Sequence, residues 1–286
     1  MIHTDFETDF YQIIKDQLAA LHYDVAADPL NRELAHKYFN LRKRQIDPAP
    51  RQVFQAKEFT CPQELQPGLD ALIRKIEAGE DLRPHQSRKL TDLNYDDTLL
   101  NDWGIQHLHL GMRLESDGFF SRTGPVLFGR FTPDSAYLIN VMGHGSWSRQ
   151  EMLRILYTNW PASLERYVMK GVIRMETHPT DDQIAKLRKA NIVTILEIIP
   201  GVVIGPMGGG YSSSGISTEV VMQTDNYLRS IKTMENNLKT NIDHLIAQAR
   251  EQGYDLSGDL RFKLLFDEAG KKLAYLPSHQ ISFEIN

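Results

Sequence analysis

The sequence predicts an α+β protein with three regions: a mostly helical part over residues 1–100, an antiparallel sheet followed by a helix over 101–168, and a carboxy-terminal α/β part over 169–286. Three observations support this class. Apolar residues recur at helical spacing in the first hundred positions. Short β-like runs separated by turn-forming segments follow Trp103, and β-branched runs alternate with helical segments beyond residue 170. A chain of 286 residues is long enough for more than one packed unit.

The amino-terminal region is expected to hold three helices. Apolar positions from Phe6 to Leu21 recur at helical spacing, and "DPLNRELAHKYFNL" supplies a second amphipathic helix before residue 45. The two prolines of "DPAPRQ" then interrupt the helical pattern. The segment "PQELQPGLDALIRKIEAGEDL" predicts a third helix that ends near Gly79.

The central region reads as a small sheet. The runs "IQHLHLGM", "GPVLFGRF" and "SAYLINVMGH" are separated by the turn-forming segments "ESDGFFSRT" and "TPDS", which predicts three adjacent antiparallel strands. A helix follows at once and ends at Pro161. Ser148 and Glu151 have the spacing of a capping box at the start of that helix.

The carboxy-terminal region mixes strands and helices. Thr180 and Gln183 predict a second capping box for "DDQIAKLRKAN", and "IVTILEII" and "GVVIGP" are β-branched runs on either side of Pro200 and Gly201. After the loop "MGGGYSSSG" the run "ISTEVVMQT" predicts a strand. A long amphipathic helix then ends at Gly253, and "LRFKLLFDEAGKKLAYL" closes the chain as a hairpin.

Composition narrows the functional classes. A net charge of −5 argues against a protein that coats nucleic acid nonspecifically, although basic residues cluster in "YFNLRKRQIDPAPRQ" and "LRPHQSRKL". No apolar run approaches the ~20 residues that cross a bilayer, and the acidic amino terminus lacks the layout of a signal peptide. The single cysteine, Cys61, excludes an internal disulfide. We therefore expect a cytoplasmic protein without a membrane segment.

Histidines mark the central sheet as the candidate site. Because strand side chains alternate, His107 and His109 share one side of their strand, while Leu108 and Leu110 lie on the other, which is expected to face the core. A third histidine, His144, ends the last strand between two glycines, where a ligand can approach the backbone.

The residues leave three uses of this set open. His107, His109 and His144 could bind a metal, since a His-x-His pair with a distant third histidine leaves an open coordination position. Alternatively, imidazoles could move the protons of a ribose 2′-hydroxyl and of the leaving oxygen while Arg122 and Arg130 stabilise the phosphorane charge, without a metal. In the third reading the histidines are hydrogen-bonded residues of a non-catalytic binding module.

One stretch resembles a known family. "SRTGPVLFGRFTPDSAYLINVMGHGSW" is similar to the terminal strands of RelE/ParE-type toxins, especially the ribonuclease branch, over about residues 103–160. In that family a basic strand precedes an "LVY" run, a short turn, a hydrophobic strand and an end rich in Arg, His and Tyr. Residues 126–128 stand at the "LVY" run, and His144 with Trp147 fills the basic and aromatic end.

The resemblance implies a toxin-like or defence-related, metal-independent endoribonuclease that uses the substrate's own 2′-hydroxyl, often on translated messenger RNA. It implies that His144 acts on the leaving group and that Trp147 binds substrate. We expect Arg149 to be a second substrate-binding residue beside Trp147. His107 and His109 are then further acid/base or phosphate-contacting groups. No cofactor or metal is expected.

This sequence departs from the pattern at one position that matters. Pro125 stands where the family carries an arginine just before the "LVY" run, so Arg122 or Arg130 must supply the charge. The usual toxin is also a single small domain. The added regions could recognise the RNA, hold the sheet inactive or bind a neutralising protein partner, whereas related folds that poison gyrase keep the sheet without the nuclease chemistry.

Overall fold

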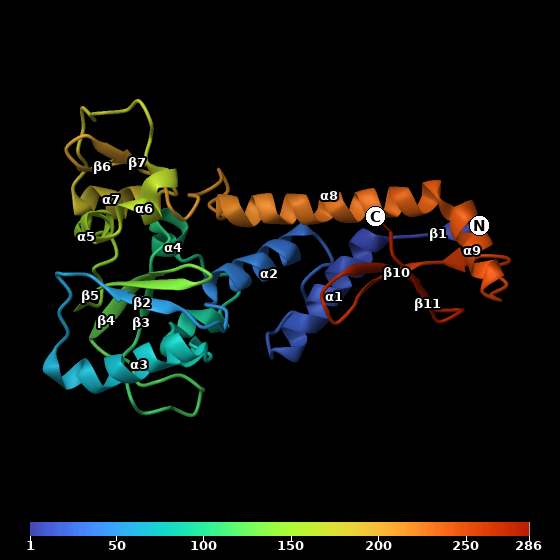
Figure 1. The fold of residues 1–286 in the computed structure, drawn as a ribbon, viewed down its shortest axis with the longest axis horizontal. Coiled ribbons are helices and arrows are strands. Elements are labelled where there is room, and N and C mark those ends of the chain that lie inside the picture. The colour runs from blue at the N-terminus through green and yellow to red at the C-terminus, as the bar shows by residue number, and fades with distance from the viewer. Residues whose placement is uncertain (286) are drawn as a thin grey trace. The chain divides into compact units, whose positions relative to one another are not determined.

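Helices and short strands follow one another along the chain in the computed structural model, which describes residues 1–285 (Figure 1). The predicted α+β class is confirmed. The chain divides into two compact units, one formed by Met1–Phe39 together with the chain from Val221 onward, and the other by Asn40–Val220. These boundaries differ from the three regions expected from the sequence, because the first and last parts of the chain belong to the same unit.

The unit that contains both ends of the chain combines helices with short strands. Its elements include α1 (Phe6–Ala20), the first part of α2 (Arg32–Arg44), most of α8 (Thr218–Thr240) and α9 (Ile242–Glu251). The strands are β1 (Ile2–His3), β8 (Leu260–Arg261), β9 (Lys263–Phe266), β10 (Lys272–Leu276) and β11 (Ile281–Phe283). Strand β1 pairs parallel with β8, whereas β9 and β10 form the predicted hairpin, which β11 extends.

Two predictions for this part of the chain are wrong. The run "ISTEVVMQT" is not a strand, since α8 begins at Thr218 and buries Val220 completely. The long helix is also divided, because α8 ends at Thr240 and α9 starts at Ile242. Asn241 lies at the break, where its side-chain amide donates to the Asn237 carbonyl at 2.9 Å, a local bond that competes with the regular helix pattern.

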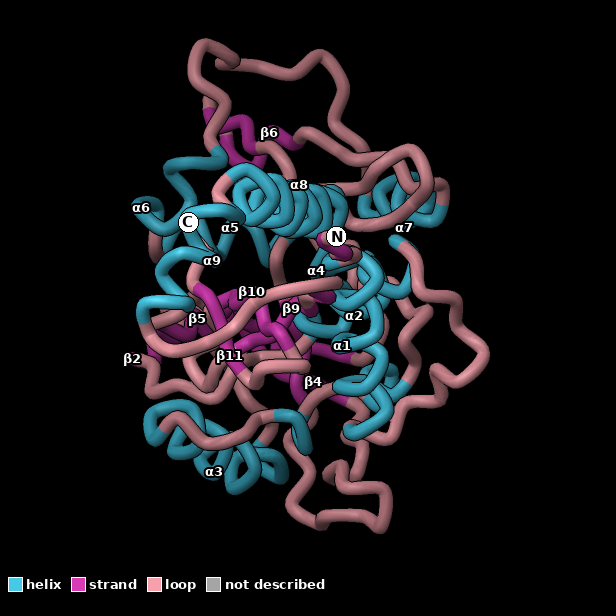
Figure 2. Tube along the Cα trace, turned by 90° about the vertical axis from the view of Figure 1, so that its right-hand side faces the viewer, coloured by secondary structure: helices cyan, strands magenta, loops and turns pink. Residues whose placement is uncertain are grey.

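The Asn40–Val220 unit is built on a sheet of four strands in the order β2-β5-β4-β3. Figure 2 labels three of these strands, β2, β5 and β4. Their bounds are β2 (Gln52–Gln55), β3 (Gln106–Leu108), β4 (Pro125–Phe131) and β5 (Ser135–Gly143). The three predicted strands are adjacent and antiparallel, as expected. The sheet as a whole is mixed, however, because β2 pairs parallel with β5. Strand β2 was not predicted, because it directly follows the two prolines of "DPAPRQ".

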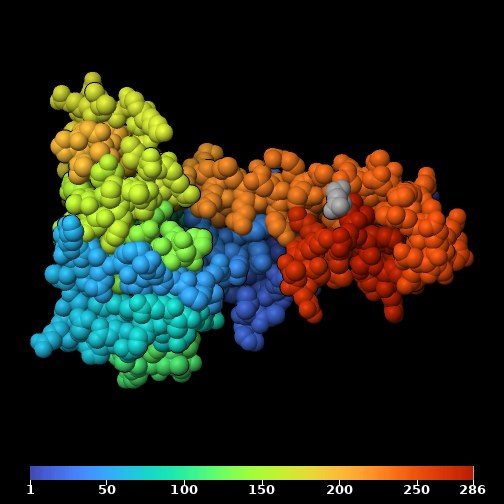
Figure 3. Space-filling view, viewed as in Figure 1, coloured from blue at the N-terminus to red at the C-terminus, as the bar shows by residue number. Residues whose placement is uncertain are grey.

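Helices and a hairpin complete this unit. The helices are α3 (Gln66–Ala78), α4 (Thr98–Trp103), α5 (Glu151–Asn159), α6 (Pro161–Leu164) and α7 (Asp181–Lys189). Four short 3₁₀ turns span Gln63–Leu65, Arg83–His85, Arg88–Thr91 and Glu165–Tyr167. The hairpin consists of β6 (Leu196–Ile199) and β7 (Val202–Ile204), which lie within the two predicted β-branched runs. In Figure 3 the yellow-green segment around residue 173 projects from this unit, where Ile173 is 78% exposed.

Both faces of the four-stranded sheet are packed. Leu108 and Leu127 contribute to a cluster with residues of α3, and Val126 and Phe128 contribute to a second cluster with residues of α4 and α5. The leucine side of the histidine strand faces a core, as expected, and the opposite side of the sheet is packed as well. Because His107 pairs with Phe128 across β3 and β4, the histidines lie beside the second cluster.

No helix in the part of the chain that the structure describes is long and apolar enough to span a membrane. This agrees with the hydropathy of the sequence.

Two predicted helix caps have different outcomes, and they supply a matched pair for stability measurements. The Thr180 hydroxyl accepts from the Gln183 amide at 3.3 Å, and the Gln183 side chain accepts from the Thr180 amide at 2.8 Å, which confirms the capping box of α7. Helix α5 instead starts after Gln150 without a side-chain cap, so the Ser148 prediction is wrong.

Thr180→Ala should lower the free energy of unfolding by about 1 kcal/mol. Ser148→Ala, the control, should stay within about 0.5 kcal/mol in the same denaturant titration.

Candidate active site

Three histidines from two segments of the chain lie close together beside β3 and the end of β5. His107 lies on β3, His109 follows that strand, and His144 follows β5. Their ring centroids are 6.1 Å apart for His107 and His109, 6.3 Å for His107 and His144, and 6.1 Å for His109 and His144. The structure thus brings together the three histidines singled out in the sequence. We call these three side chains the histidine triangle.

The rings of the histidine triangle differ in their access to solvent. His109 is buried, with 2% of its surface exposed, His107 is half-buried and His144 is exposed. The Thr123 amide donates to His109 Nδ1 at 3.3 Å, so the neutral ring carries its proton on Nε2. That Nε2 is buried and has no hydrogen-bond partner among the described residues.

The backbone fixes where these rings lie. The amide of His109 donates to the His85 carbonyl at 2.7 Å, and His85 Nδ1 donates back to the His109 carbonyl at 2.9 Å. The amide of His144 donates to the Gly124 carbonyl at 2.9 Å, so the turn after β5 is tied to the start of β4. Two long-range contacts therefore hold the exposed and buried members of the triangle in place.

Burial and neighbouring positive groups keep two of the rings neutral. Burial is the largest cause that lowers the pKa of His107 to about 4, and His144 and Arg122 are smaller causes of the same sign. Burial is also the largest cause that lowers the pKa of His109 to about 4, with smaller contributions from His107 and Arg122. All the charged groups that act on these two pKa values are basic. The histidine triangle therefore has an electrostatic environment that favours an anion.

Trp147 covers one side of the triangle. Its ring lies 4.6 Å from that of His107, 4.9 Å from that of His144 and 5.4 Å from that of Phe128, measured between centroids. The side chain is half-buried, so part of the indole remains open to a ligand. The predicted substrate-binding tryptophan is therefore in direct contact with two of the predicted catalytic histidines.

A buried ion pair that the sequence did not reveal holds the backbone of Trp147. Arg188 on α7 donates through Nη1 to the Trp147 carbonyl, and its Nε lies 2.7 Å from Asp102 Oδ2. The guanidinium carbon also lies 3.9 Å from the centroid of the Trp103 ring. The exposed fractions of the Arg188 and Asp102 side chains are 4% and 0%. Nothing in the charged segment "DDQIAKLRKAN" distinguishes Arg188 as the residue that forms a buried ion pair.

The predicted arginines have different positions. Arg122 is exposed and acts electrostatically on His107 and His109, which places it with the triangle. Arg130 is instead almost buried on β4, where it donates to the Ser163 carbonyl at 3.4 Å and to the Tyr167 hydroxyl at 3.3 Å. These contacts tie the sheet to the segment after α5 and do not involve the histidine triangle.

The groove neighbours of Arg149 do not include the histidine triangle either. Its side chain is exposed and lines an open groove beside α5 together with Glu58, Arg154 and Asp181. The acidic neighbours reduce the positive charge of that groove. Among the predicted substrate-binding residues, Trp147 alone contacts the histidines.

The residues do not fit a metal centre. Within residues 1–285, no group of three or more His, Cys, Asp or Glu side chains is arranged to hold a metal ion. A metal-binding histidine also usually donates its second ring N–H to a carboxylate or carbonyl, whereas Nδ1 of His109 accepts from an amide.

In comparisons with protein-family models, curated proteins and solved structures, nothing matches this chain. The resemblance to RelE/ParE-type toxins therefore stays a prediction.

Proposed function

We propose that this protein is a metal-independent endoribonuclease of toxin-like or defence-related type that cleaves RNA through the substrate's 2′-hydroxyl. The observation that carries the proposal is the histidine triangle, in which three imidazole rings lie 6.1 to 6.3 Å apart and the positive charge of Arg122 acts on His107 and His109. A phosphodiester is the anion that such a set can both bind and cleave.

The reaction needs no added reactant. The 2′-hydroxyl loses its proton to a base and its oxygen attacks the neighbouring phosphorus. The bond from phosphorus to the 5′-oxygen breaks, and that oxygen takes up a proton, which gives a 2′,3′-cyclic phosphate and a 5′-hydroxyl end. His144 suits the proton transfer because it is exposed to the substrate. The neutral His107 and His109 suit hydrogen bonding to phosphate oxygens, and Arg122 suits stabilisation of the developing charge.

The surroundings of the triangle support an RNA ligand. The partly open Trp147 ring offers a surface on which a base can stack. Translated messenger RNA in the cytoplasm is the proposed substrate on the strength of the family resemblance, and a neutralising protein partner would then be needed to control the activity. The net charge of −5 fits an enzyme with one local anion site better than a general RNA coat.

Cleavage of RNA by the wild type and by His144→Ala, each with and without a chelator, tests the proposal. The wild type should cleave equally with and without chelator and leave 2′,3′-cyclic phosphate ends. His144→Ala should lose at least about 10²-fold in rate, the usual contribution of one acid/base group. A substrate with a single 2′-deoxy residue at the cleaved position should resist cleavage because it has no internal nucleophile.

His244→Ala is the matched control, since His244 is an exposed histidine on α9. Its cleavage rate should equal that of the wild type. Activity that disappears with chelator would favour a metal-dependent hydrolase that uses the three histidines. No cleavage of any RNA would contradict the proposal and favour a non-catalytic protein-binding module.

A further inference from the structure

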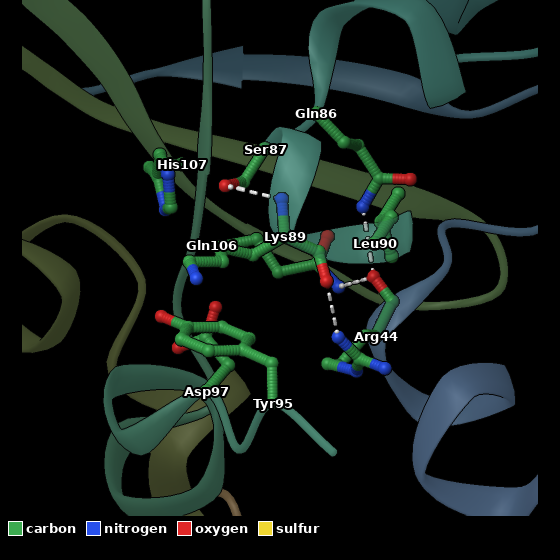
Figure 4. Close-up of a pocket in the computed structure, with 9 residues that line it drawn as sticks. All are labelled: Arg44, Gln86, Ser87, Lys89, Leu90, Tyr95, Asp97, Gln106 and His107. Atoms are coloured by element: carbon green, nitrogen blue, oxygen red, sulfur yellow. Dashed lines mark hydrogen bonds between the residues drawn. The ribbon is translucent and has the colours of Figure 1, made fainter. Parts of the chain in front are cut away.

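The pocket beside His107 is too small to hold an organic ligand. Figure 4 shows hydrogen bonds between its lining residues, among them those from Arg44 to the Lys89 carbonyl and from Gln86 to the Arg44 carbonyl. Its volume is about 20 Å³, which is room for one water molecule. A second organic ligand therefore needs a larger cavity elsewhere in the protein.

Such a cavity is lined by α8 and β10, in the unit that contains both ends of the chain. Its volume is about 390 Å³, within the range of sites that bind small molecules. Helix α8 contributes Arg229, Ser230 and Thr233, which are three and four positions apart and so share one face, and β10 contributes Lys272. Arg229 and Thr233 are exposed, so a ligand can enter directly from solvent.

Lys272 differs from the other lysines of this unit in its partners. Ion pairs with Asp or Glu side chains are formed by Lys37, Lys232, Lys239, Lys263 and Lys271. Lys15 donates to two backbone carbonyls. The ammonium of Lys272 instead donates to the Ser230 hydroxyl and lies 4.4 Å from the centroid of the Tyr227 ring, and no carboxylate among the described residues pairs with it.

This ammonium is half-buried without a negative charge beside it. Withdrawing a charge from water costs free energy unless an opposite charge replaces the water, and burial accordingly lowers the pKa of Lys272. The bond to Ser230 and the contact with the Tyr227 ring nevertheless hold the ammonium at the cavity. An anion in the cavity would supply the missing opposite charge.

Arg229 brings a second positive charge to the same cavity. Its Nη1 donates to Asn226 Oδ1 at 3.3 Å, and the guanidinium has further N–H groups that can donate to a ligand. No acidic side chain lines the cavity among the described residues. Met234 and Ile285 add apolar surface to the wall. The cavity therefore combines two cations from different elements with a hydroxyl group and an apolar side.

We infer that this cavity binds a small phosphate monoester, with its phosphate group held by Lys272 and Arg229. Such a phosphate carries about 1.5 to 2 negative charges at neutral pH, which matches the two cations. Its three terminal oxygens can accept from the ammonium, the guanidinium and the Thr233 hydroxyl together. The organic part would contact Met234 and Ile285. The inference goes beyond the proposed function, because the cavity and the histidine triangle belong to different units.

Titration of the full chain with ribose 5-phosphate, followed by NMR of the backbone amides, tests the inference. The amides of Arg229, Ser230, Thr233 and Lys272 should shift as the cavity fills. Lys272→Met should weaken this binding by at least about tenfold, since it removes a charged hydrogen-bond donor. Arg229→Met should weaken it similarly, and because Arg229 is exposed this variant keeps the fold even if Lys272→Met does not. Inorganic phosphate should bind at least about threefold more weakly than the ester, because it makes no apolar contact.

Arg250→Met is the matched control, because it removes one positive charge from an exposed position on α9 in the same unit. Its affinity for ribose 5-phosphate should equal that of the wild type. Shifts confined to amides around the histidine triangle would overturn the inference, and so would an affinity that Lys272→Met and Arg229→Met leave unchanged. Equal affinity for inorganic phosphate and ribose 5-phosphate would also overturn it and leave an adventitious ion site only. RNA cleavage should be unchanged in Lys272→Met, so the proposed function is tested separately.

Discussion

Arg188→Met should lower the free energy of unfolding by about 3–5 kcal/mol, the usual cost of removing one partner from a buried ion pair. The Asp102 carboxylate would remain with none of its surface exposed and without the guanidinium 2.7 Å away. The Trp147 carbonyl would also lose its donor. Denaturant unfolding followed by tryptophan fluorescence measures this change in the correct unit, because all three tryptophans lie within Asn40–Val220.

An exposed ion pair in the same unit supplies the control. Arg42 and Asp47 lie 3.1 Å apart with exposed fractions of 51% and 64%. Since solvent screens such a pair, Arg42→Met should cost less than about 1 kcal/mol. If Arg188→Met and Arg42→Met lose similar amounts, the buried pair does not contribute as argued.

The double variant Asp102→Leu with Arg188→Met separates stability from positioning of the site. Removing both charges should recover much of the lost stability, since no charge is then left buried alone. The hydrogen bond from Arg188 to the Trp147 carbonyl is still missing in this variant. Cleavage should therefore remain below the wild-type rate in the stable double variant, which a purely structural role of Arg188 would not produce.

The fold was predictable where local signals agreed with the tertiary structure. Thr180 and Gln183 form their capping box because both side chains meet only local backbone groups. Strand β2 was missed because four residues after two prolines carry no alternation, and its pairing partner Ser135 is more than eighty positions away. The start of α8 was read as a strand because β-branched residues occur where the buried face of the helix lies.

The candidate site was predictable in part. The His-x-His spacing and the end of the third strand identified the histidine triangle because strand geometry fixes which side chains share a face. The partners of Arg130 could not be predicted, because a charged residue on a strand gives no sign that a distant hydroxyl, that of Tyr167, accepts its hydrogen bond. Arg188 was missed for the same reason, since its role depends on contacts between segments far apart in the sequence.

Acid should destabilise the Asn40–Val220 unit through three buried or half-buried imidazoles. Burial lowers the pKa of His85, His107 and His109 to about 4 in the folded protein, against about 6.5 in the unfolded chain. Between these values the unfolded state binds more protons, so the free energy of unfolding falls as the pH drops from 6.5 towards 4. At pH 5 the loss amounts to about 2 kcal/mol for each ring, and several kcal/mol is a large fraction of a domain's stability.

His109→Gln isolates one of these contributions. Its loss of stability between pH 7 and pH 5, measured by denaturant unfolding with tryptophan fluorescence, should be smaller than that of the wild type by about 2 kcal/mol. His178→Gln is the control in the same unit, because that side chain is 60% exposed, and its loss should match the wild type. Equal losses in all three proteins would show that His109 titrates alike in both states. Inorganic phosphate should reduce the wild-type loss, because an anion at the triangle favours the protonated rings and so raises their pKa in the folded protein.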